Sequence, residues 1–126
     1  MKVVLANGCF DGLHAGHVTH LQQARGMGDR LVVSVTRDDF VSKGKGRPVF
    51  TAHQRAAVLF ELECVDNVVI VDGVIEALER IKPAIFVKGP DYVNSITPIH
   101  QEFCDKNGIE IRFTTGEKLS STALFK

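Results

Sequence analysis

The sequence predicts an α/β domain in which a parallel β-sheet is covered by helices on both faces. Five short runs rich in β-branched residues are typical of buried strands, at residues 2–6, 30–36, 67–71, 84–87 and 109–113. A helix-like segment lies between each two successive runs, and parallel strands need crossovers of that kind. We therefore expect a Rossmann-like three-layer sandwich with a five-stranded parallel sheet in the order 3-2-1-4-5.

Helix start and stop signals support this alternation. Helices are expected over residues 17–27, 52–63, 73–81 and 98–107. Thr51 stands three residues before Gln54, which is a capping-box pattern at the start of the second helix. The fourth helix is expected to begin with Pro98 in its first turn and to end at Gly108.

Length and charge bound the possible functions. The chain has 126 residues, of which 44% are hydrophobic, so residues 1–126 are expected to form a single domain with its own core. Lys plus Arg and Asp plus Glu number 15 each, which leaves no overall field to attract nucleic acid or an anionic membrane. The eight Phe and one Tyr are not interleaved with basic residues, which further disfavours a nucleic-acid partner.

The cysteines and the apolar stretches indicate an intracellular setting. Cys9, Cys64 and Cys104 are widely spaced and form no C-x-x-C pair, which fits neither a disulfide scaffold nor a zinc knuckle. The apolar stretches are too short to cross a membrane, and the start has no long apolar signal core. We expect a cytoplasmic protein without a membrane partner and without a metal held by protein ligands.

Polar chemistry gathers in four segments that follow predicted strands. These are NGCFDGLHAGH (7–17), RDDFVSKGKGRP (37–48), KGPDY (88–92) and TTGEKLSST (114–122). In α/β sheets of this kind, ligands bind outside the carboxyl ends of the strands. The four segments are therefore expected to meet at one edge of the sheet and to form the site there.

The first of these segments has the composition of a phosphate-binding turn. Gly8, Gly12 and Gly16 let the backbone approach a ligand, and Gly16 opens a helix whose first N–H groups favour an anion. His14 and His17 are three residues apart at this helix start, so both rings can lie on one side of it. A chain of phosphates is the expected ligand.

Other sites were weighed for the same segment. A histidine pair can bind zinc, but zinc needs a third protein ligand and only Cys9 is near in the sequence. The sequence contains no G-x-x-x-x-G-K-[ST] loop, and the glycine spacing does not match G-x-G-x-x-G. The turn is thus neither a Walker loop nor the usual dinucleotide fingerprint.

The segment GCFDGLHAGHVTHLQQAR closely resembles the HxGH region of the cytidylyltransferase-like nucleotidyltransferases. That superfamily includes glycerol-3-phosphate cytidylyltransferase and the adenylyltransferase half of the ADP-heptose synthesis enzyme. The resemblance continues through GDRLVVSVTRDDF, RPV, HQR, VDNVVIV, FVKGPDY and SST. It implies transfer of a nucleotidyl group from an NTP, carried with Mg²⁺, to a small phosphorylated acceptor with release of pyrophosphate, by a homodimer.

The resemblance also implies roles for individual residues. The triphosphate would be held by the catalytic residues His14, His17, Lys43 and Lys45. The nucleotide would be bound by Asn7, Gly8, Cys9, Phe10, Gly16, Lys88, Gly89, Asp91, Ser120, Ser121 and Thr122. The acceptor substrate would be bound by Asp11, Asp38 and Arg55. Most short basic runs are solvated loops, and this is the alternative interpretation of the segment that contains Lys43 and Lys45. Which of these two lysines would contact the phosphates is left open.

Substrate identity is divided between two members of the superfamily. VKGPDY resembles the heptose-phosphate adenylyltransferase, whereas the length and DDF resemble the glycerol-phosphate enzyme. The end of the chain lacks the arginine of the latter's RTEGIS segment, and Lys118 is the expected replacement. Heptose 1-phosphate with ATP is the favoured pair, and glycerol 3-phosphate with CTP is the alternative. A nucleotide-binding module without catalysis is the alternative that is not an enzyme.

Overall fold

The computed structural model describes residues 1–40, 50–90, 93 and 95–115, and within this range it contains five strands and four α-helices. The strands are β1 (Val3–Gly8), β2 (Arg30–Thr36), β3 (Asn67–Val71), β4 (Ile85–Lys88) and β5 (Glu110–Phe113). The helices are α1 (Ala15–Arg25), α2 (Ala52–Phe60), α3 (Val74–Ile81) and α4 (Pro98–Asn107), with a short 3-10 helix, η1, at Asp38–Phe40. The strands pair in parallel in the order β3-β2-β1-β4-β5, which confirms the predicted fold class and strand order.

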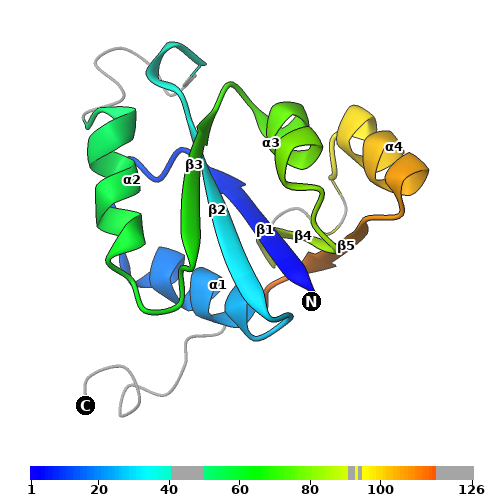
Figure 1. Ribbon diagram of the computed structural model, residues 1–126, viewed down its shortest axis with the longest axis horizontal. Coiled ribbons are helices and arrows are strands. Elements are labelled where there is room, and N and C mark those ends of the chain that lie inside the picture. Colours follow the sequence, from blue (N-terminus) through cyan, green and yellow to red (C-terminus); the bar gives the residue numbers. More distant parts are fainter. Residues whose placement is uncertain (41–49, 91–92, 94, 116–126) are drawn as a thin grey trace.

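Helices cover both faces of the sheet (Figure 1). Val4 and Ala6 of β1 pack in the cluster that contains the buried side chains of α1 and α2. Leu5, which lies between them, packs with Phe86 and the buried side chains of α3 and α4. This alternation is what the two-residue period of a strand requires when both faces are covered.

β1 lies at the centre of the sheet and marks the point where the strand order reverses. It pairs with β2 on one side, where Val4 faces Leu31, and with β4 on the other, where Val4 faces Ile85. From β1 the chain builds outward through β2 and β3, and it then crosses to start again at β4. Ligands of such sheets bind at the carboxyl ends beside this reversal, which places the expected site next to the ends of β1 and β4.

The helix boundaries agree with the predicted signals in two cases and differ in two others. Thr51 and Gln54 form the predicted capping box, and Gly108 ends α4 in the left-handed conformation with φ 66°. α1 begins at Ala15, two residues before the predicted start, because His14 supplies its N-cap. α2 ends at Phe60 because the chain then enters a series of turns stabilised by backbone hydrogen bonds.

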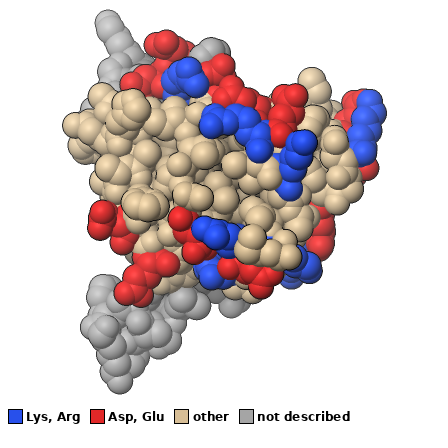
Figure 2. Space-filling view, viewed as in Figure 1, with Lys and Arg blue, Asp and Glu red and all other residues tan. Residues whose placement is uncertain are grey.

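The charged surface is mixed. Figure 2 shows Lys and Arg side chains among Asp and Glu over the visible face, and a largely uncharged area over α2. The exposed side chains of α2 include Val58 and Phe60, which are 53% and 57% exposed. In the part of the chain that is described, no helix is long and apolar enough to cross a bilayer.

Candidate nucleotide site at the start of α1

The turn between β1 and α1 has an unusual backbone. Phe10 has a φ of +52° and Gly12 has a φ of +94°, and both values lie in the left-handed region. A Cβ on Gly8 would lie 2.8 Å from the ring of Phe10, so this position needs glycine to let the ring fold back over the strand end. Phe10 is 8% exposed, and its buried ring holds the turn against the core.

His14 and His17 together cap the start of α1. Nδ1 of His14 accepts the N–H of Gly16 at 3.0 Å, and Nδ1 of His17 accepts the N–H of His14 at 3.2 Å. This is the reciprocal arrangement of a capping box, made here by two imidazoles instead of a hydroxyl and an amide. A Cβ on Gly16 would lie 2.8 Å from Cε1 of His14, so glycine is needed there to admit the ring.

The cap determines which ring nitrogens can act as donors. Because each Nδ1 accepts a backbone N–H, the proton of each neutral ring lies on Nε2. The two rings lie close together, with centroids 3.9 Å apart and planes tilted by 30°, and Phe10 packs edge-on against His17 at 5.6 Å. α1 has no acidic residue in its first turn. The helix start therefore combines two imidazole N–H donors with the positive end of the helix dipole, a combination that favours a polyanion.

The three predicted substrate-binding residues form one connected set beside this turn. Asp11 accepts the N–H of Phe50 at 2.9 Å, and Nε of Arg55 donates to the carbonyl of Phe50 at 3.0 Å. Arg55 also pairs with Asp38 at 2.6 Å and donates to the carbonyl of Cys9 at 2.7 Å. The Arg55 side chain is 1% exposed, so in this structure it links the turn, η1 and α2. Its contact with substrate stays a prediction.

Asn7 and Lys88 lie at the carboxyl ends of the two strands beside the reversal. The Asn7 amide donates to Oγ of Ser34 at 2.7 Å and thereby ties the end of β1 to β2. Nζ of Lys88 lies 5.3 Å from the centroid of the Phe86 ring, on the face of the sheet that carries α3 and α4. Burial lowers the pKa of Lys88 from its ordinary value, because the low-dielectric surroundings disfavour the ammonium form. Gly89, which follows directly, has no neighbour within 4 Å of the position a Cβ would take.

Two residues outside the predicted set also join this edge of the sheet. His20 lies one turn after His17 on α1, and its Nδ1 is 2.8 Å from Oγ1 of Thr114, the residue that follows β5. The N–H of Thr114 donates to the carbonyl of Lys88 at 3.0 Å. The H-x-x-H-x-x-H spacing of His14, His17 and His20 was the sequence signal that could have indicated His20. Thr114 begins the polar segment 114–122 that was expected at this edge, but no pattern indicated its contact with α1.

Several predicted residues lie outside the described residues. They are Lys43, Lys45, Asp91, Lys118, Ser120, Ser121 and Thr122. The described part of the site is thus the β1–α1 turn, the histidines of α1, the Asp38–Arg55 pair and the ends of β4 and β5.

A cavity of about 640 Å³ lies beside the turn. Phe10, Gly12 and Leu13 form one wall, and Phe50 and Val58 lie on the α2 side. Phe10 connects this recess to the histidine row through its contact with His17. The candidate site thus places a mainly apolar recess next to a group of hydrogen-bond donors, as ligand sites commonly do.

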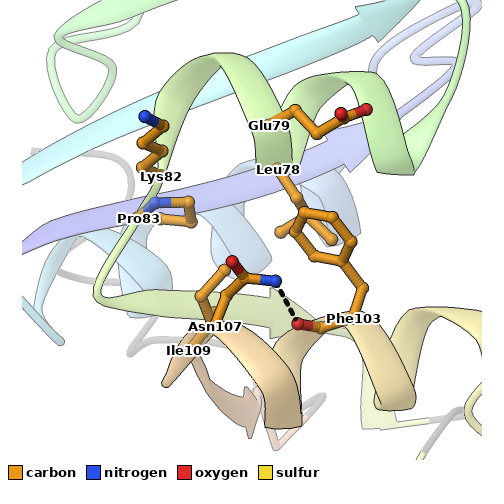
Figure 3. Close-up of a pocket in the computed structure, with 7 residues that line it drawn as sticks. All are labelled: Leu78, Glu79, Lys82, Pro83, Phe103, Asn107 and Ile109. Carbon is orange, nitrogen blue, oxygen red and sulfur yellow. Dashed lines mark hydrogen bonds between the residues drawn. The ribbon is translucent and has the colours of Figure 1, made fainter.

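A second cavity, of about 400 Å³, lies at the opposite edge of the sheet. Figure 3 shows it between the ends of α3 and α4, where Leu78, Phe103 and Ile109 form its apolar part. The Asn107 amide, on the same rim, donates to the carbonyl of Phe103 at 2.8 Å. This cavity lies where β4 and β5 begin, not where they end, so it is not part of the candidate site.

Zinc was the alternative ligand for the histidine pair. Among residues 1–40, 50–90, 93 and 95–115, no three His, Cys, Asp or Glu side chains are grouped so that they could hold a metal ion. The Nδ1 atoms of both histidines accept backbone N–H groups, as described above. Both Nδ1 atoms are thus engaged in the helix cap, and a polyanion as the ligand of this helix start stays a prediction.

The chain is similar in sequence to part of two curated bacterial proteins. A bifunctional protein HldE from Helicobacter hepaticus is 44% identical over 124 residues, which are 95% of this chain and 25% of that protein. The HldE protein of Azotobacter vinelandii is 53% identical over 95 residues, 72% of this chain and 20% of that protein. The chain thus spans a quarter or less of the length of these curated relatives.

A solved structure matches over nearly its whole length. The crystal structure of the lipopolysaccharide core biosynthesis protein from Thermoplasma volcanium superposes with a TM-score of 0.76 and 31% identity, over 95% of this chain and 99% of that chain. The sequence model of the cytidylyltransferase-like family matches residues 5–124. With this match, the HxGH turn and the parallel sheet, the chain belongs to the cytidylyltransferase-like family of nucleotidyltransferases.

Proposed function

We propose that this chain transfers a nucleoside monophosphate from an NTP to a phosphorylated sugar or polyol and releases pyrophosphate. The observation that carries the proposal is the double imidazole cap of α1, in which His14 and His17 both have a protonated Nε2 at a helix N-terminus. Ordinary helix starts use Ser, Thr, Asp or Asn for this purpose. The use of two imidazoles is better explained by a polyanionic ligand than by the needs of the helix.

The reaction needs little acid–base chemistry. An oxygen of the acceptor's phosphate attacks the α-phosphorus, a new P–O bond forms, and the bond from the α-phosphorus to the bridging oxygen breaks to release pyrophosphate. The attacking oxygen is already anionic near neutral pH, so no general base has to remove a proton from it. Catalysis then depends on aligning two anions and stabilising the charge that develops around the α-phosphorus.

The residues of the site supply these two functions. His14 and His17 would donate from Nε2 to the triphosphate, and Lys88 would add a positive charge from the end of β4. The burial of Lys88 makes its charge less screened by water, which strengthens its attraction for phosphate. Lys43 or Lys45, together with Ser120, Ser121 and Thr122, remain predicted phosphate ligands that lie outside the described residues.

Magnesium is proposed to arrive with the nucleotide. The described residues contain no group of three His, Cys, Asp or Glu that could hold the ion by themselves. Triphosphates commonly carry Mg²⁺ on their own oxygens, with few protein ligands. When bound, the ion would offset phosphate charge.

Heptose 1-phosphate with ATP is the proposed substrate pair. The VKGPDY segment supports it through its resemblance to the heptose-phosphate adenylyltransferase, and a superposed relative is named as a lipopolysaccharide core biosynthesis protein, which fits a sugar acceptor. Glycerol 3-phosphate with CTP remains the alternative because of the DDF segment. The proposal concerns one activity alone, since the chain spans only 25% of the bifunctional protein HldE from Helicobacter hepaticus.

A pyrophosphate-release screen tests the proposal. ATP, CTP, GTP and UTP would each be combined with Mg²⁺ and a panel of sugar and polyol phosphates. We expect release with ATP and heptose 1-phosphate, and His14→Ala or His17→Ala to reduce it by on the order of 100-fold or more. His53→Ala, which removes an exposed imidazole from α2, is the matched control and should retain activity. Nucleotide binding without pyrophosphate release for any pair would instead indicate a binding module.

Three further expectations stay predictions. A single domain over residues 1–126, a homodimer and a cytoplasmic location follow from the sequence and its resemblance. Light scattering of the purified chain would decide the dimer, and limited proteolysis would test the single domain.

A further inference from the structure

The third imidazole of α1 lies at a joint between three elements. His20 is half-buried, and its Nδ1 lies 2.8 Å from Oγ1 of Thr114. Thr114 is 3% exposed, so its hydroxyl depends on protein partners for hydrogen bonding. The backbone N–H of Thr114 donates to the carbonyl of Lys88 at 3.0 Å. A continuous chain of contacts therefore runs from α1 through β5 to the end of β4.

This chain joins two parts of the candidate site, the capping imidazoles of α1 and Lys88 at the end of β4. His17 lies one turn before His20 on the same helix, and Lys88 is the residue whose carbonyl accepts the last hydrogen bond of the chain. We propose that His20 is a positioning residue, which holds α1 and its capping histidines at a fixed distance from Lys88 through Thr114. The inference rests on the proposed function, because positioning matters only if one ligand contacts both parts.

The electrostatics of His20 support a neutral ring in this role. Burial lowers the pKa of His20, and the electrostatic effects of His17 and Lys88 lower it further. A neutral imidazole bonds a hydroxyl in either tautomer, by donating or by accepting. A neutral His20 can thus hold Thr114 without adding a charge between the capping imidazoles and Lys88.

A neighbouring contact provides a matched control. Gln23, one turn after His20, donates from Nε2 to Oγ1 of Thr115 at 3.1 Å, and its Oε1 accepts the N–H of Thr115 at 2.9 Å. These two exposed bonds also join α1 to the residues that follow β5. They tie α1 to Thr115, whereas the bond to the Lys88 carbonyl is made by Thr114.

The test compares four single variants of the full chain and the double variant His20→Gln, Thr114→Val. His20→Asn places an amide near the Nδ1 position and can still bond Thr114, whereas His20→Gln places its amide near Nε2 and cannot. Thr114→Val removes the hydroxyl, and Gln23→Ala removes the control contact. Measurements would be kcat and KM by pyrophosphate release, the melting temperature, and the affinity for inorganic tripolyphosphate.

The inference predicts a specific pattern. His20→Gln and Thr114→Val should each lower kcat by on the order of 10-fold or more. The double variant should have a kcat no lower than that of either single variant, because both changes break the same contact. His20→Asn should retain most of the kcat of the unmodified chain. Gln23→Ala leaves kcat unchanged. The inference is overturned if Gln23→Ala lowers kcat as much as His20→Gln does, or if His20→Asn lowers kcat as much as His20→Gln does. It is also overturned if the effects of His20→Gln and Thr114→Val on kcat multiply in the double variant.

Failure of the proposed function would be recognised separately. If the unmodified chain releases no pyrophosphate with any pair of substrates, the proposed function is wrong. Affinity for tripolyphosphate then decides the inference, because a ligand that contacts the capping histidines and Lys88 should bind more weakly to His20→Gln and Thr114→Val than to Gln23→Ala. Equal affinities in these variants would contradict the positioning role.

Discussion

Two helices of this protein begin with the same backbone arrangement and different side chains. At α2, Oγ1 of Thr51 accepts the N–H of Gln54 at 3.2 Å, and Oε1 of Gln54 accepts the N–H of Thr51 at 2.9 Å. At α1, the imidazoles of His14 and His17 occupy the corresponding positions and accept backbone N–H groups in the same way. Both starts therefore satisfy the unpaired donors that every helix has.

The difference between the two caps lies in what remains after the backbone is satisfied. A threonine hydroxyl and a glutamine amide are among the usual groups for this purpose, whereas histidine is not a favoured cap. Two neutral imidazoles add two Nε2–H donors at the positive end of the helix. The same two residues can therefore cap a helix and supply donors to a ligand. The use of histidine in place of an ordinary capping residue is the sign of the second role.

Exchanging one cap for the other has the largest expected effect. The double variant His14→Ser, His17→Gln reproduces the pattern of the α2 cap at α1. Nucleotidyl transfer should fall by on the order of 100-fold or more, because two phosphate donors are lost. The melting temperature should stay the same or rise, because a Ser and Gln pair is a favourable capping box.

Thr51→Ala completes this comparison. It should lower the free energy of unfolding by about 1 kcal/mol while the turnover per folded molecule is retained. Turnover would be followed by pyrophosphate release and stability by urea unfolding. Retained turnover in the exchanged variant would show that the imidazoles of α1 serve only the helix.

The link between the two caps can be cut at Arg55. This residue directly follows Gln54, is 1% exposed, and bonds the carbonyl of Cys9 in the turn that leads to α1. Arg55→Met leaves the part-buried carbonyl groups of Cys9 and Phe50 without these donors and leaves Asp38 without its cation, so the unfolding free energy should fall by on the order of 3 kcal/mol. Urea unfolding measures this.

An exposed ion pair is the control for that substitution. Lys106, 72% exposed, pairs with Glu102 one turn away on α4. Lys106→Met should change the stability by less than about 0.5 kcal/mol. A loss at Arg55 no larger than this would mean that the turn before α1 is held by its own packing alone.

The glycines at the two ends of α1 sharpen the comparison further. A Cβ at Gly16 would lie 2.8 Å from Cε1 of His14, whereas a Cβ at Gly26 would meet its nearest atom at 3.4 Å. Gly16→Ala should therefore displace the His14 ring and reduce turnover by roughly 10-fold, while the gain in helix propensity limits the loss of stability to under about 1 kcal/mol. Gly26→Ala should leave turnover unchanged. Equal activities of the two variants would contradict a fixed orientation of His14.

The smallest expected effect is on the pH dependence of stability. Burial lowers the pKa of His20 and of His100 below the ordinary value of 6.5, and the charge of Lys88 contributes in both cases. The unfolded chain therefore binds these protons more readily, so stability present above pH 6.5 is lost as the pH falls toward the lowered pKa values. Urea unfolding would be measured at about pH 7.5 and about pH 5. Between these two values, the free energy of unfolding should fall less in His20→Asn than in the unmodified chain.

The same substitution at exposed His53 on α2 is the control for this experiment. An unchanged pH dependence in His20→Asn would mean that His20 takes up a proton as readily in the folded protein as in the unfolded chain.

The fold was predictable because its signals are local and repeated. Runs such as 30–36 and 84–87 are rich in apolar and β-branched residues, which indicates strands that are buried on both faces, and both were confirmed as β2 and β4 within one residue at each end. Thr51, Gln54 and Gly108 gave helix ends correctly because capping depends on neighbouring residues. The start of α1 was placed two residues late because histidine is not among the residues that usually signal a cap.

Contacts between distant residues were not predictable from the sequence. The predicted contact of Arg55 with substrate stays a prediction, but no local pattern indicates that its buried side chain bonds Cys9, Phe50 and Asp38. The contact of His20 with Thr114 joins residues 94 positions apart, and no local pattern indicates it. Such pairings depend on how helices lie against the sheet, which the sequence signals do not resolve.

The sequence by itself determined the alternation of strands and helices, the strand end at which polar residues gather, and the resemblance of the HxGH turn. It could do so because hydrophobic period, glycine position and residue spacing act over a few residues. Only the tertiary structure decided that the two histidines share one cap with Nδ1 bonded inward, that Arg55 is internal, and that Thr114 connects α1 to Lys88. These depend on distances across the parallel sheet, where residues far apart in the chain are brought within hydrogen-bonding range.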